Sequence, residues 1–389
     1  MKHGAAIIVI GTGLAGYHLA KELRKLDTEV PLILITQDDG AFYSKPMLSN
    51  AVAKQKTPAQ LVMQTADVMA QQLNAQILTQ TTVLSIDAVA QQVVTRGGVY
   101  AYRQLVLACG AQPVMPPISG AERLFNVNNL TDYGHFRAAL EQLKNALDRP
   151  PRLLILGAGL IGCEFANDFV VSGFEVQLVD MATQCLPRLL PAAMAAVLQA
   201  RLVEQGVRFH FNQRVQFIDD QLGSYQVSCE SGQSFSADLV LSAIGLQPNI
   251  ALAQQAQITT QRGIVVDAYL RTSVSNIYAL GDCAQVQGHW LCYVLPLMAA
   301  ARALAKTLSG QPTSVRYPSM PVVIKTPACP LVVCPPPPFS VGQWQVQSFD
   351  DYWQGLFTDA QGSLCGFALL GNFPQVEKNR LLQQMPILI

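Results

Sequence analysis

Residues 5–16 read AAIIVIGTGLAG, an apolar run followed by a glycine-rich turn. The run has the unbroken apolar pattern of a strand that is buried on both faces. Gly11 allows a tight turn, Gly13 lets the backbone approach a pyrophosphate, and Gly16 allows a helix to pack closely on the strand. A helical segment and the apolar run PLILIT at 31–36 follow. The pattern predicts a βαβ unit that binds a dinucleotide phosphate at a helix N-terminus.

The pattern occurs a second time. The stretch RLLILGAGLIGCEFANDF at 152–169 again places three glycines, Gly157, Gly159 and Gly162, directly after an apolar strand. A glycine-rich turn without a ligand is the alternative for a single motif, and the repetition argues against it. Two nucleotide sites in one chain indicate two cofactors that exchange electrons.

The residue at the end of the second strand of each unit bears on which nucleotide it binds. The second unit runs on to VQLVD, which ends at Asp180. An acid there hydrogen-bonds a ribose 2′-hydroxyl and repels a 2′-phosphate, so this site should take NADH over NADPH. The alternative is a solvated strand-end aspartate. In the first unit the strand ends at Thr36, and the usual acid is missing. We expect Asp38 to substitute for it from the turn.

Bulk composition excludes several classes of protein. The chain has 389 residues, which suggests two or three domains, with 26 basic and 26 acidic side chains and a net charge of +0. This balance gives no electrostatic case for nucleic acid or an anionic membrane. No apolar run reaches the roughly 18–20 residues that span a bilayer, and the N-terminus does not read as a signal peptide. Nine scattered cysteines without a CxxC pair make no zinc site. We expect a cytoplasmic protein.

Two further strands end in glycine. They are YRQLVLACGAQP at 102–113, with Gly110, and SNIYALGDCA at 275–284, with Gly281 and Asp282. They resemble the connection motif and the second FAD motif of the two-dinucleotide-binding flavoprotein superfamily, which has the glutathione-reductase-like fold. The resemblance implies that Gly110 lines the FAD site and that Asp282 binds the ribityl chain. It also implies that the helix after YVLPLM, which contains Pro296, faces the flavin pyrimidine, where its dipole stabilises negative charge.

The resemblance also implies the architecture. The fold class is α/β, with two Rossmann-like dinucleotide-binding domains, one for FAD and one for NAD, and a small C-terminal α+β domain. We expect a discontinuous FAD-binding domain over 1–112 and 238–317. An NADH-binding domain over 113–237 is inserted in it, and a C-terminal domain over 318–389 covers the flavin.

The stretch AFYSKPMLS at 41–49 contains no cysteine. Disulfide reductases of the superfamily carry a redox cysteine near this place, so a thiol relay beside the flavin is absent here. Glu164 lies among apolar residues of the second fingerprint helix, where a carboxylate is costly unless it is paired. In the superfamily a lysine and a glutamate pair near flavin N5, and we therefore expect a catalytic Lys45–Glu164 ion pair. The alternative is a solvated Lys45 and a Glu164 that merely favours the helix start.

Taken together, the stretches IGTGLAGYHLAKELRKLDTE, YSKPMLS, LGAGLIGCEFANDF, RGIVVDAYLRTS, NIYALGDCA, YVLPLMAAARALA and KTPACPLVV resemble the rubredoxin–NAD reductases of bacterial alkane oxidation. The resemblance implies that electrons pass from NADH through FAD, one at a time, to rubredoxin, a small acidic iron protein. Ferredoxin or flavorubredoxin reductases are the alternatives of the same kind. A flavoprotein with a non-enzymatic, redox-dependent interaction role is the alternative of a different class.

The stretch KTPACPLVVC at 325–334 completes the candidates. We expect Cys329 and Cys334 to be buried strand cysteines and not a redox pair. Lys325 is expected to approach the flavin edge, with a surface lysine as the alternative. A local basic patch should attract rubredoxin, because the chain has no net charge. Its candidates are Arg302, Lys306, Arg316 and Lys325.

Overall fold

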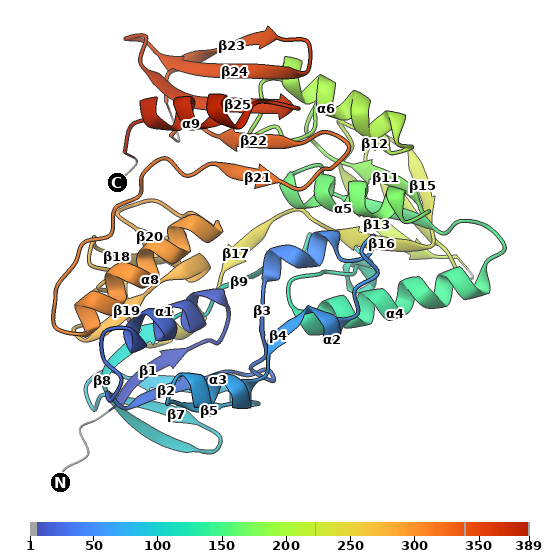
Figure 1. The fold of residues 1–389 in the computed structure, drawn as a ribbon. Helices are drawn as coiled ribbons and strands as arrows, with labels where there is room; N and C mark the ends of the chain where they lie inside the picture. Colours follow the sequence, from blue (N-terminus) through green and yellow to red (C-terminus); the bar gives the residue numbers. More distant parts are fainter. Residues whose placement is uncertain (1–5, 222, 338–339, 388–389) are drawn as a thin grey trace.

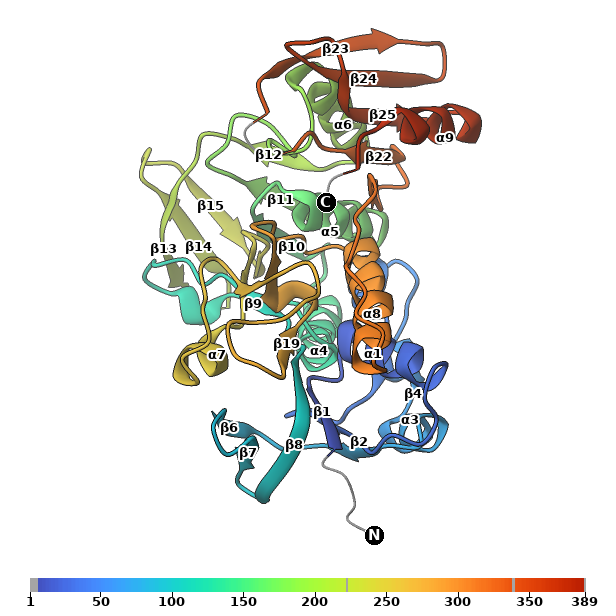
Figure 2. The same cartoon turned by 90° about the vertical axis from the view of Figure 1, so that its left-hand side faces the viewer.

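The fold was analysed in a computed structural model, which describes residues 6–221, 223–337 and 340–387. Three units are stacked, with the C-terminal unit at one end, a middle unit, and an N-terminal unit at the other end (Figures 1 and 2). Parallel sheets form the cores of the N-terminal and middle units, and an antiparallel sheet with one helix forms the C-terminal unit. The predicted fold class is confirmed.

The sheet of the N-terminal unit is built from two separate parts of the chain. Its parallel strands, in spatial order, are β5 (Gln76–Leu78), β2 (Leu32–Ile35), β1 (Ala6–Ile10), β8 (Gly98–Leu107) and β19 (Ile277–Ala279). The antiparallel hairpin of β6 (Val83–Asp87) and β7 (Gln92–Thr95) extends the first half of β8. Helices α1 (Leu14–Arg24) and α8 (Val294–Leu308) pack together on this sheet, and every residue of β1 is buried.

The middle unit repeats this arrangement. Its parallel strands are β12 (Arg208–His210), β11 (Glu175–Val179), β10 (Arg152–Leu156) and β16 (Leu239–Ser242). A small antiparallel sheet joins β13 (Val215–Asp220), β14 (Tyr225–Cys229) and β15 (Ser234–Ala237). The helices are α4 (Leu130–Ala146), α5 (Leu160–Val171) and α6 (Ala192–Glu204). Phe136, Phe165 and Phe169 pack ring against ring between α4 and α5 and form the centre of this core.

The chain crosses between the two units through a pair of short antiparallel strands. It leaves the N-terminal unit along β9 (Ala111–Pro113) and returns along β17 (Leu246–Pro248), with Leu246 opposite Pro113. The return leads to α7 (Ala251–Gln255), to β18 (Ile264–Val266), which pairs with β20 (Ala284–Val286), and to the 3₁₀ helix η3 (Gly281–Cys283). A further 3₁₀ helix, η2 (Ala121–Arg123), follows β9.

An excursion of the N-terminal unit, residues 42–64, leans against the middle unit. It contains β3 (Phe42–Tyr43), the 3₁₀ helix η1 (Lys45–Asn50), α2 (Pro58–Leu61) and β4 (Val62–Gln64), and α3 (Ala66–Gln72) follows it. Leu48, Ala51 and Leu61 are buried against Tyr133 of α4. The segment that follows the first nucleotide motif is therefore held by the unit that carries the second one.

The C-terminal unit shares its core with the middle unit. Its antiparallel strands, in spatial order, are β21 (Val322–Ile324), β22 (Leu331–Cys334), β25 (Leu364–Gly371), β24 (Tyr352–Asp359) and β23 (Gly342–Ser348), and α9 (Gln375–Gln384) packs on β25. One face of the sheet, with Val333 and Leu370, belongs to the same apolar cluster as Met194 and Leu198 of α6. Across the described residues, no helix combines the length and the apolar character that a membrane crossing needs.

Candidate active site

The first glycine motif forms an open phosphate cradle. Gly11 has a φ of +114°, and a Cβ atom there would lie 2.3 Å from the carbonyl oxygen of Ala108. A Cβ atom on Gly16 would lie 1.9 Å from the carbonyl oxygen of Gly11, so helix and turn approach as closely as backbone allows. Gly13 is the N-cap of α1, no side chain caps the helix, and nothing lies within 4 Å of the position of its missing Cβ. The space and the free N–H groups suit the pyrophosphate of FAD.

The second motif has the same geometry at α5. Gly157 has a φ of +103°, a Cβ atom on Gly162 would lie 1.9 Å from the carbonyl oxygen of Gly157, and the N-cap Gly159 faces open space. Asp180 follows β11, and its carboxylate accepts hydrogen bonds from the backbone N–H groups of Ala158 at 2.6 Å and Ala182 at 2.8 Å. The charge of Asp180 is thereby fixed beside the phosphate turn, where the predicted ribose contact needs it.

Thr36 and Asp38 lie at the carboxyl end of β2, beside the first cradle. The Thr36 hydroxyl donates to Oδ1 of Asp38 at 2.5 Å, and the N–H of Gly40 donates to the same oxygen at 3.0 Å. Thr36 is buried and Asp38 is exposed. The turn therefore presents a carboxylate to solvent next to the cradle, and its predicted role at the FAD ribose stays a prediction.

The proposed flavin end collects groups from three segments. Gly281 has a φ of +77°, and a Cβ atom there would lie 2.8 Å from Cβ of Ala15 in α1, which explains the glycine before Asp282. Burial lowers the pKa of Lys45, and the charge of Asp282 opposes this shift. Burial raises the pKa of Asp282, and the charge of Lys45 opposes that shift. Lys45 and Asp282 thus lie close enough to interact electrostatically, and each is the main charge acting on the other.

Two further predicted FAD residues border this region. Gly110 follows β8, next to the strand that leads to Asp282, and its φ is +68° with open space beside it. Pro296 is buried in the first turn of α8, whose N-cap Tyr293 makes no side-chain cap. Sequence reasoning missed Cys292, which precedes that helix. Burial raises the pKa of its thiol, and Asp282 and Lys45 also act on it, which places Cys292 in the same group.

The predicted Lys45–Glu164 ion pair is wrong, because Glu164 is paired with a different lysine. Glu164 is 1% exposed, and the lysine that neutralises it is Lys325, with Nζ 2.7 Å from Oε2. The backbone N–H of Lys325 donates to Oε1 at 2.8 Å, and the Ser49 hydroxyl donates to Oε2. Lys325 Nζ also donates to Ser49 Oγ at 2.7 Å and to the carbonyl oxygen of Pro46.

The reason for the exchange lies in the packing of the units. Lys45 is the first residue of η1, whereas Ser49, one turn later, faces α5. The C-terminal sheet packs on the middle unit and brings the residue after β21, which is Lys325, onto the same helix. Nothing in the sequence chooses between two lysines, because both are far from Glu164 along the chain.

The cysteines take no part in this network. All nine are free, and Cys329 and Cys334 are both buried, as predicted, but only Cys334 lies in a strand, β22, whereas Cys329 lies in the turn before it. Burial raises the pKa of each of these two thiols to about 11, so both are protonated at neutral pH. Across the described residues, no cluster of three His, Cys, Asp or Glu side chains is arranged to hold a metal ion.

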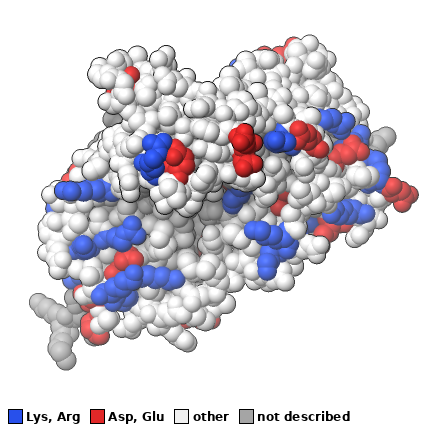
Figure 3. All heavy atoms as spheres, turned by 45° about the horizontal axis from the view of Figure 1, so that its top comes forward, with Lys and Arg blue, Asp and Glu red and all other residues white. Residues whose placement is uncertain are grey.

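One of the four basic residues expected in a docking patch is engaged elsewhere, because Lys325 pairs with Glu164. Arg302 lies near α1: burial lowers the pKa of His18, and the charges of Lys21 and Arg302 lower it further. Arg302 and Lys306 lie one turn apart on α8. In the space-filling view, basic side chains outnumber acidic ones on the left of Figure 3. The patch itself stays a prediction.

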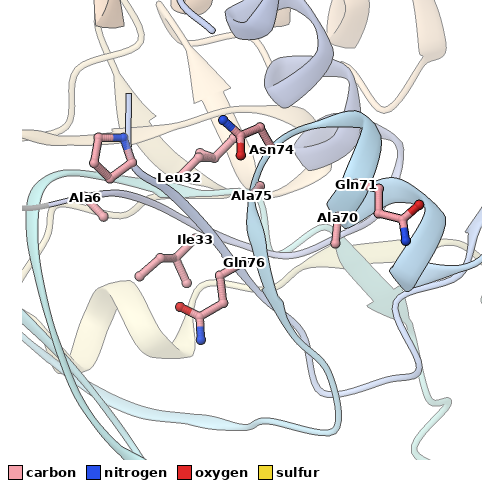
Figure 4. Close-up of a pocket in the computed structure, with 9 residues that line it drawn as sticks. Ala6, Leu32, Ile33, Ala70, Gln71, Asn74, Ala75 and Gln76 are labelled. Atoms are coloured by element: carbon pink, nitrogen blue, oxygen red, sulfur yellow. The ribbon is translucent and has the colours of Figure 1, made fainter. Parts of the chain in front are cut away.

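A cavity of about 600 Å³ lies elsewhere, at the amino ends of β1, β2 and β5 (Figure 4). Ala6, Ile33 and Gln76 belong to its wall, and none of its lining residues is charged. Ligands of open parallel sheets bind at the carboxyl ends of the strands, so this cavity is at the opposite edge from the glycine cradles.

Comparison with known proteins agrees with this geometry. The sequence model of the pyridine nucleotide-disulphide oxidoreductases matches residues 5–305, and that of a rubredoxin binding C-terminal domain matches residues 314–385. The chain is 47% identical to the rubredoxin-NAD(+) reductase of Alcanivorax borkumensis, over 98% of this chain and 99% of that one. It is 40% identical to the nitric oxide reductase FlRd-NAD(+) reductase of Aeromonas hydrophila subsp. hydrophila, over 98% and 96%.

Solved structures show the same fold. The putidaredoxin reductase of a covalent putidaredoxin reductase–putidaredoxin complex superposes with a TM-score of 0.86 at 27% identity, over 97% of this chain and 92% of that one. Both the middle and the N-terminal units are covered by this match and by the first family model. The chain belongs to the pyridine nucleotide-disulphide oxidoreductase family and, within it, to the rubredoxin-NAD(+) reductases.

Proposed function

We propose that this chain is an FAD-dependent NADH:rubredoxin oxidoreductase. The observation that carries the proposal is the pair of open glycine cradles, at the N-termini of α1 and α5. The rubredoxin binding domain matched at 314–385 gives the acceptor. Bound FAD would accept a hydride from NADH and release two electrons singly.

The residues around the proposed flavin end would have separable tasks. Asp282 would hold the ribityl chain, and Lys45 would balance the charge of its half-buried carboxylate. The N-terminus of α8, which no side chain caps, would stabilise negative charge on the bound flavin. Glu164, Ser49 and Lys325 connect α5, the excursion and the C-terminal unit, and they would hold the three units in register around the cofactors.

Asp180 is the proposed determinant of nucleotide choice. Its carboxylate is fixed beside the α5 cradle by two backbone N–H groups, so it cannot swing away from an entering 2′-phosphate. The negative charge repels that phosphate, whereas the carboxylate accepts a hydrogen bond from the ribose 2′-hydroxyl of NADH. Thr36 and Asp38 are proposed to border the FAD adenosine in the corresponding place of the first unit.

From the sequence, the proposed domains are 1–112 with 238–317 for FAD, 113–237 for NADH, and 318–389 for the C-terminal domain that covers the flavin. The pairing of β19 with β8 supports a discontinuous first domain, since it joins residues 277–279 to the N-terminal sheet. The first boundary, at 112, falls in β9, but the boundary at 238 is too early: β16 pairs with β10 in the sheet of the middle unit, so we move this boundary to β17. We place the reaction in the cytoplasm, where the nine free thiols stay reduced.

The acceptor has a second candidate. The relative that is 40% identical is named for a flavorubredoxin, so the rubredoxin-like domain of such a protein is the alternative acceptor. A ferredoxin is a third, supported by the shared fold with a putidaredoxin reductase. Delivery of electrons to alkane hydroxylation is the pathway that we propose for the rubredoxin case.

Steady-state oxidation of NADH against a panel of purified rubredoxins, a flavorubredoxin and ferredoxins tests the proposal. We expect a yellow protein with one FAD per chain and the highest kcat/KM with a rubredoxin. Reduction of the flavin by NADH without turnover on any carrier would instead favour the non-enzymatic interaction role. A colourless protein that takes up no added FAD would refute the whole proposal.

A further inference from the structure

Helix α5 carries three buried polar side chains on one face. Glu164, Asn167 and Asp168 are 1%, 3% and 3% exposed, and their spacing places them on adjacent turns. Each accepts a hydrogen bond from a segment outside the middle unit. Glu164 takes Lys325 and Ser49, and Asn167 Oδ1 accepts the N–H of Ala328 at 3.2 Å. The helix that begins at the NADH cradle is thus also the place where the three units meet.

Asp168 is the member of this face that accepts hydrogen bonds from two successive backbone N–H groups. Its Oδ2 accepts the N–H of Val52 at 3.0 Å, and its Oδ1 accepts the N–H of Ala53 at 3.1 Å. Both amides follow η1. The carbonyl oxygen of Lys56, at the far end of the same turn, accepts from Tyr133 Oη at 2.7 Å and from Arg137 Nη1 at 3.0 Å. The excursion that carries Lys45 and Ser49 is therefore pinned by α5 and α4.

A buried carboxylate in this position is not there for stability. Burial raises the pKa of Asp168 to about 6, against the opposing effect of the two backbone N–H groups. Because the pKa in the folded protein lies above the ordinary value, ionisation of Asp168 costs stability as the pH rises from about 4 to about 6. What the ionised group supplies is geometric, since it offers one acceptor oxygen to each of two successive N–H groups. An amide or a protonated acid would oppose one N–H with a donor.

We propose that Asp168 is a positioning residue that fixes the segment 45–53 in register with helix α5, so that the flavin and the nicotinamide meet at reactive distance. The inference rests on the proposed function, because it assigns the two cradles to FAD and NADH. Hydride transfer depends steeply on distance, and a displacement of about 1 Å can cost roughly 100-fold in rate. Asp168 acts on the reaction through the backbone of Val52 and Ala53 and touches neither cofactor.

The inference predicts a pH dependence with a definite sign. The clamp is complete above pH 6, where Asp168 is charged, and weakens below it. Other charged or titratable groups face Asp168: Lys54 on the excursion, Lys325 from the C-terminal unit, Tyr133 on α4 and Glu164 one turn away on α5. The lysines favour the ionised form of Asp168. Only a variant at Asp168 itself isolates its contribution from that of these neighbours.

The test compares the wild-type protein with Asp168→Asn. Asp238→Asn is the matched control, because Asp238 is also a buried carboxylate of the middle unit that accepts a backbone N–H, from Arg152 at 2.7 Å. Burial alone would raise the pKa of Asp238, but hydrogen bonds from Arg149 and Arg152 hold it well below its usual range, so it does not titrate near pH 6. Flavin reduction by NADH is followed by stopped flow between pH 5 and 8. Hydrogen–deuterium exchange of peptides covering 45–56 is measured alongside, with and without FAD.

We expect Asp168→Asn to lower the limiting rate of flavin reduction about tenfold at pH 7.5, with the Kd for NADH changed less than threefold, because the loss is one of alignment. The wild-type rate should fall on the acid side of pH 6, and this step should vanish in Asp168→Asn and persist in Asp238→Asn. Exchange at 45–56 should be faster in Asp168→Asn even without FAD.

Two results would overturn the inference. One is a flat wild-type profile from pH 5 to 8, which decides the matter even if the variant does not fold. The other is an Asp168→Asn protein with wild-type rate and wild-type exchange at 45–56. A wild-type protein that NADH does not reduce at all would overturn the proposed function, and with it this inference, whereas either of the first two results leaves the proposed function intact.

Discussion

Lys325 Nζ lies 2.7 Å from Oε2 of Glu164, although the two residues are 161 positions apart in the chain. The lysine comes from the C-terminal unit and the glutamate from the helix of the NADH cradle. Ser49, from the excursion of the N-terminal unit, bonds to both. A single buried carboxylate on the helix of the second glycine cradle thus connects all three units.

Lys325→Met should slow flavin reduction and destabilise the protein. The substitution leaves the charge of Glu164 buried without its cation, and breaking a buried pair costs roughly 3–5 kcal/mol, less here because Lys325 is partly exposed. We expect a loss of about 2 kcal/mol in the free energy of unfolding, measured by urea denaturation. Lys25→Met, which removes only a surface pair with Glu22, is the control and should change neither quantity. Equal effects of both variants would contradict the assignment.

Lys45→Met and Asp282→Ala should weaken the binding of FAD. Each residue is the main charge opposing the burial of the other, so loss of either leaves the other group uncompensated. The Kd for FAD, measured by titration of the apoprotein, should rise about tenfold or more in each variant. In the double variant the two effects should not add, because the pair is removed as a unit. Fully additive effects would show that the two charges act independently.

NADH should reduce the flavin far better than NADPH, and Asp180→Asn should narrow the difference. The asparagine retains an oxygen for the N–H of Ala158 but has no charge to repel a 2′-phosphate. The ratio of the two kcat/KM values should fall about tenfold, which corresponds to about 1.4 kcal/mol. An unchanged ratio would exclude Asp180 as the determinant. Asp180→Ala should lose more activity than Asp180→Asn with both nucleotides, since it also removes the acceptor of the two backbone N–H groups that hold the turn.

The double variant Cys329→Ser with Cys334→Ser should retain nearly full turnover. Both thiols are buried, Cys334 in β22 and Cys329 in the turn before it, and their raised pKa of about 11 keeps them protonated and unreactive. Turnover with rubredoxin and the rate of flavin reduction are the two measurements. Loss of either one in a folded, FAD-loaded variant would mean that thiol chemistry belongs to the mechanism.

Rubredoxin reduction should decrease as the salt concentration rises, while flavin reduction by NADH changes little. The screening length is about 10 Å at 0.1 M salt, so charge steering of a transient protein partner is lost first. Arg302→Glu and Arg316→Glu should raise the KM for rubredoxin and flatten its salt dependence. Lys325 is excluded from this set because Glu164 neutralises it. Salt effects of equal size on both half-reactions would refute electrostatic docking.

The glycine motifs were predictable from sequence because part of their physics is local. Gly11 and Gly281 have positive φ angles, which disfavour any side chain, whereas the atoms that a Cβ would meet belong to Ala108 and Ala15 in other segments. The buried charge of Glu164 was also predictable, since an acid in an apolar helix needs a partner. Its partner was not, because the choice between Lys45 and Lys325 depends on how the C-terminal sheet packs on α6. The hydrogen-bond partners of the Asp168 side chain are backbone N–H groups. Every residue except proline carries such a group, so the sequence does not indicate which of them Asp168 contacts.

The antiparallel pair of β9 and β17 has a mechanical meaning. Both direct covalent connections between the N-terminal and middle units run side by side there, so a rotation of one unit against the other would centre on this pair. The C-terminal unit shares the apolar core of the middle unit, so such a rotation would carry the two together. Moving the NADH cradle would then also move the C-terminal unit, whose sequence matches the rubredoxin binding domain. The binding of the nucleotide and the access of rubredoxin would then both depend on the angle between the N-terminal and middle units.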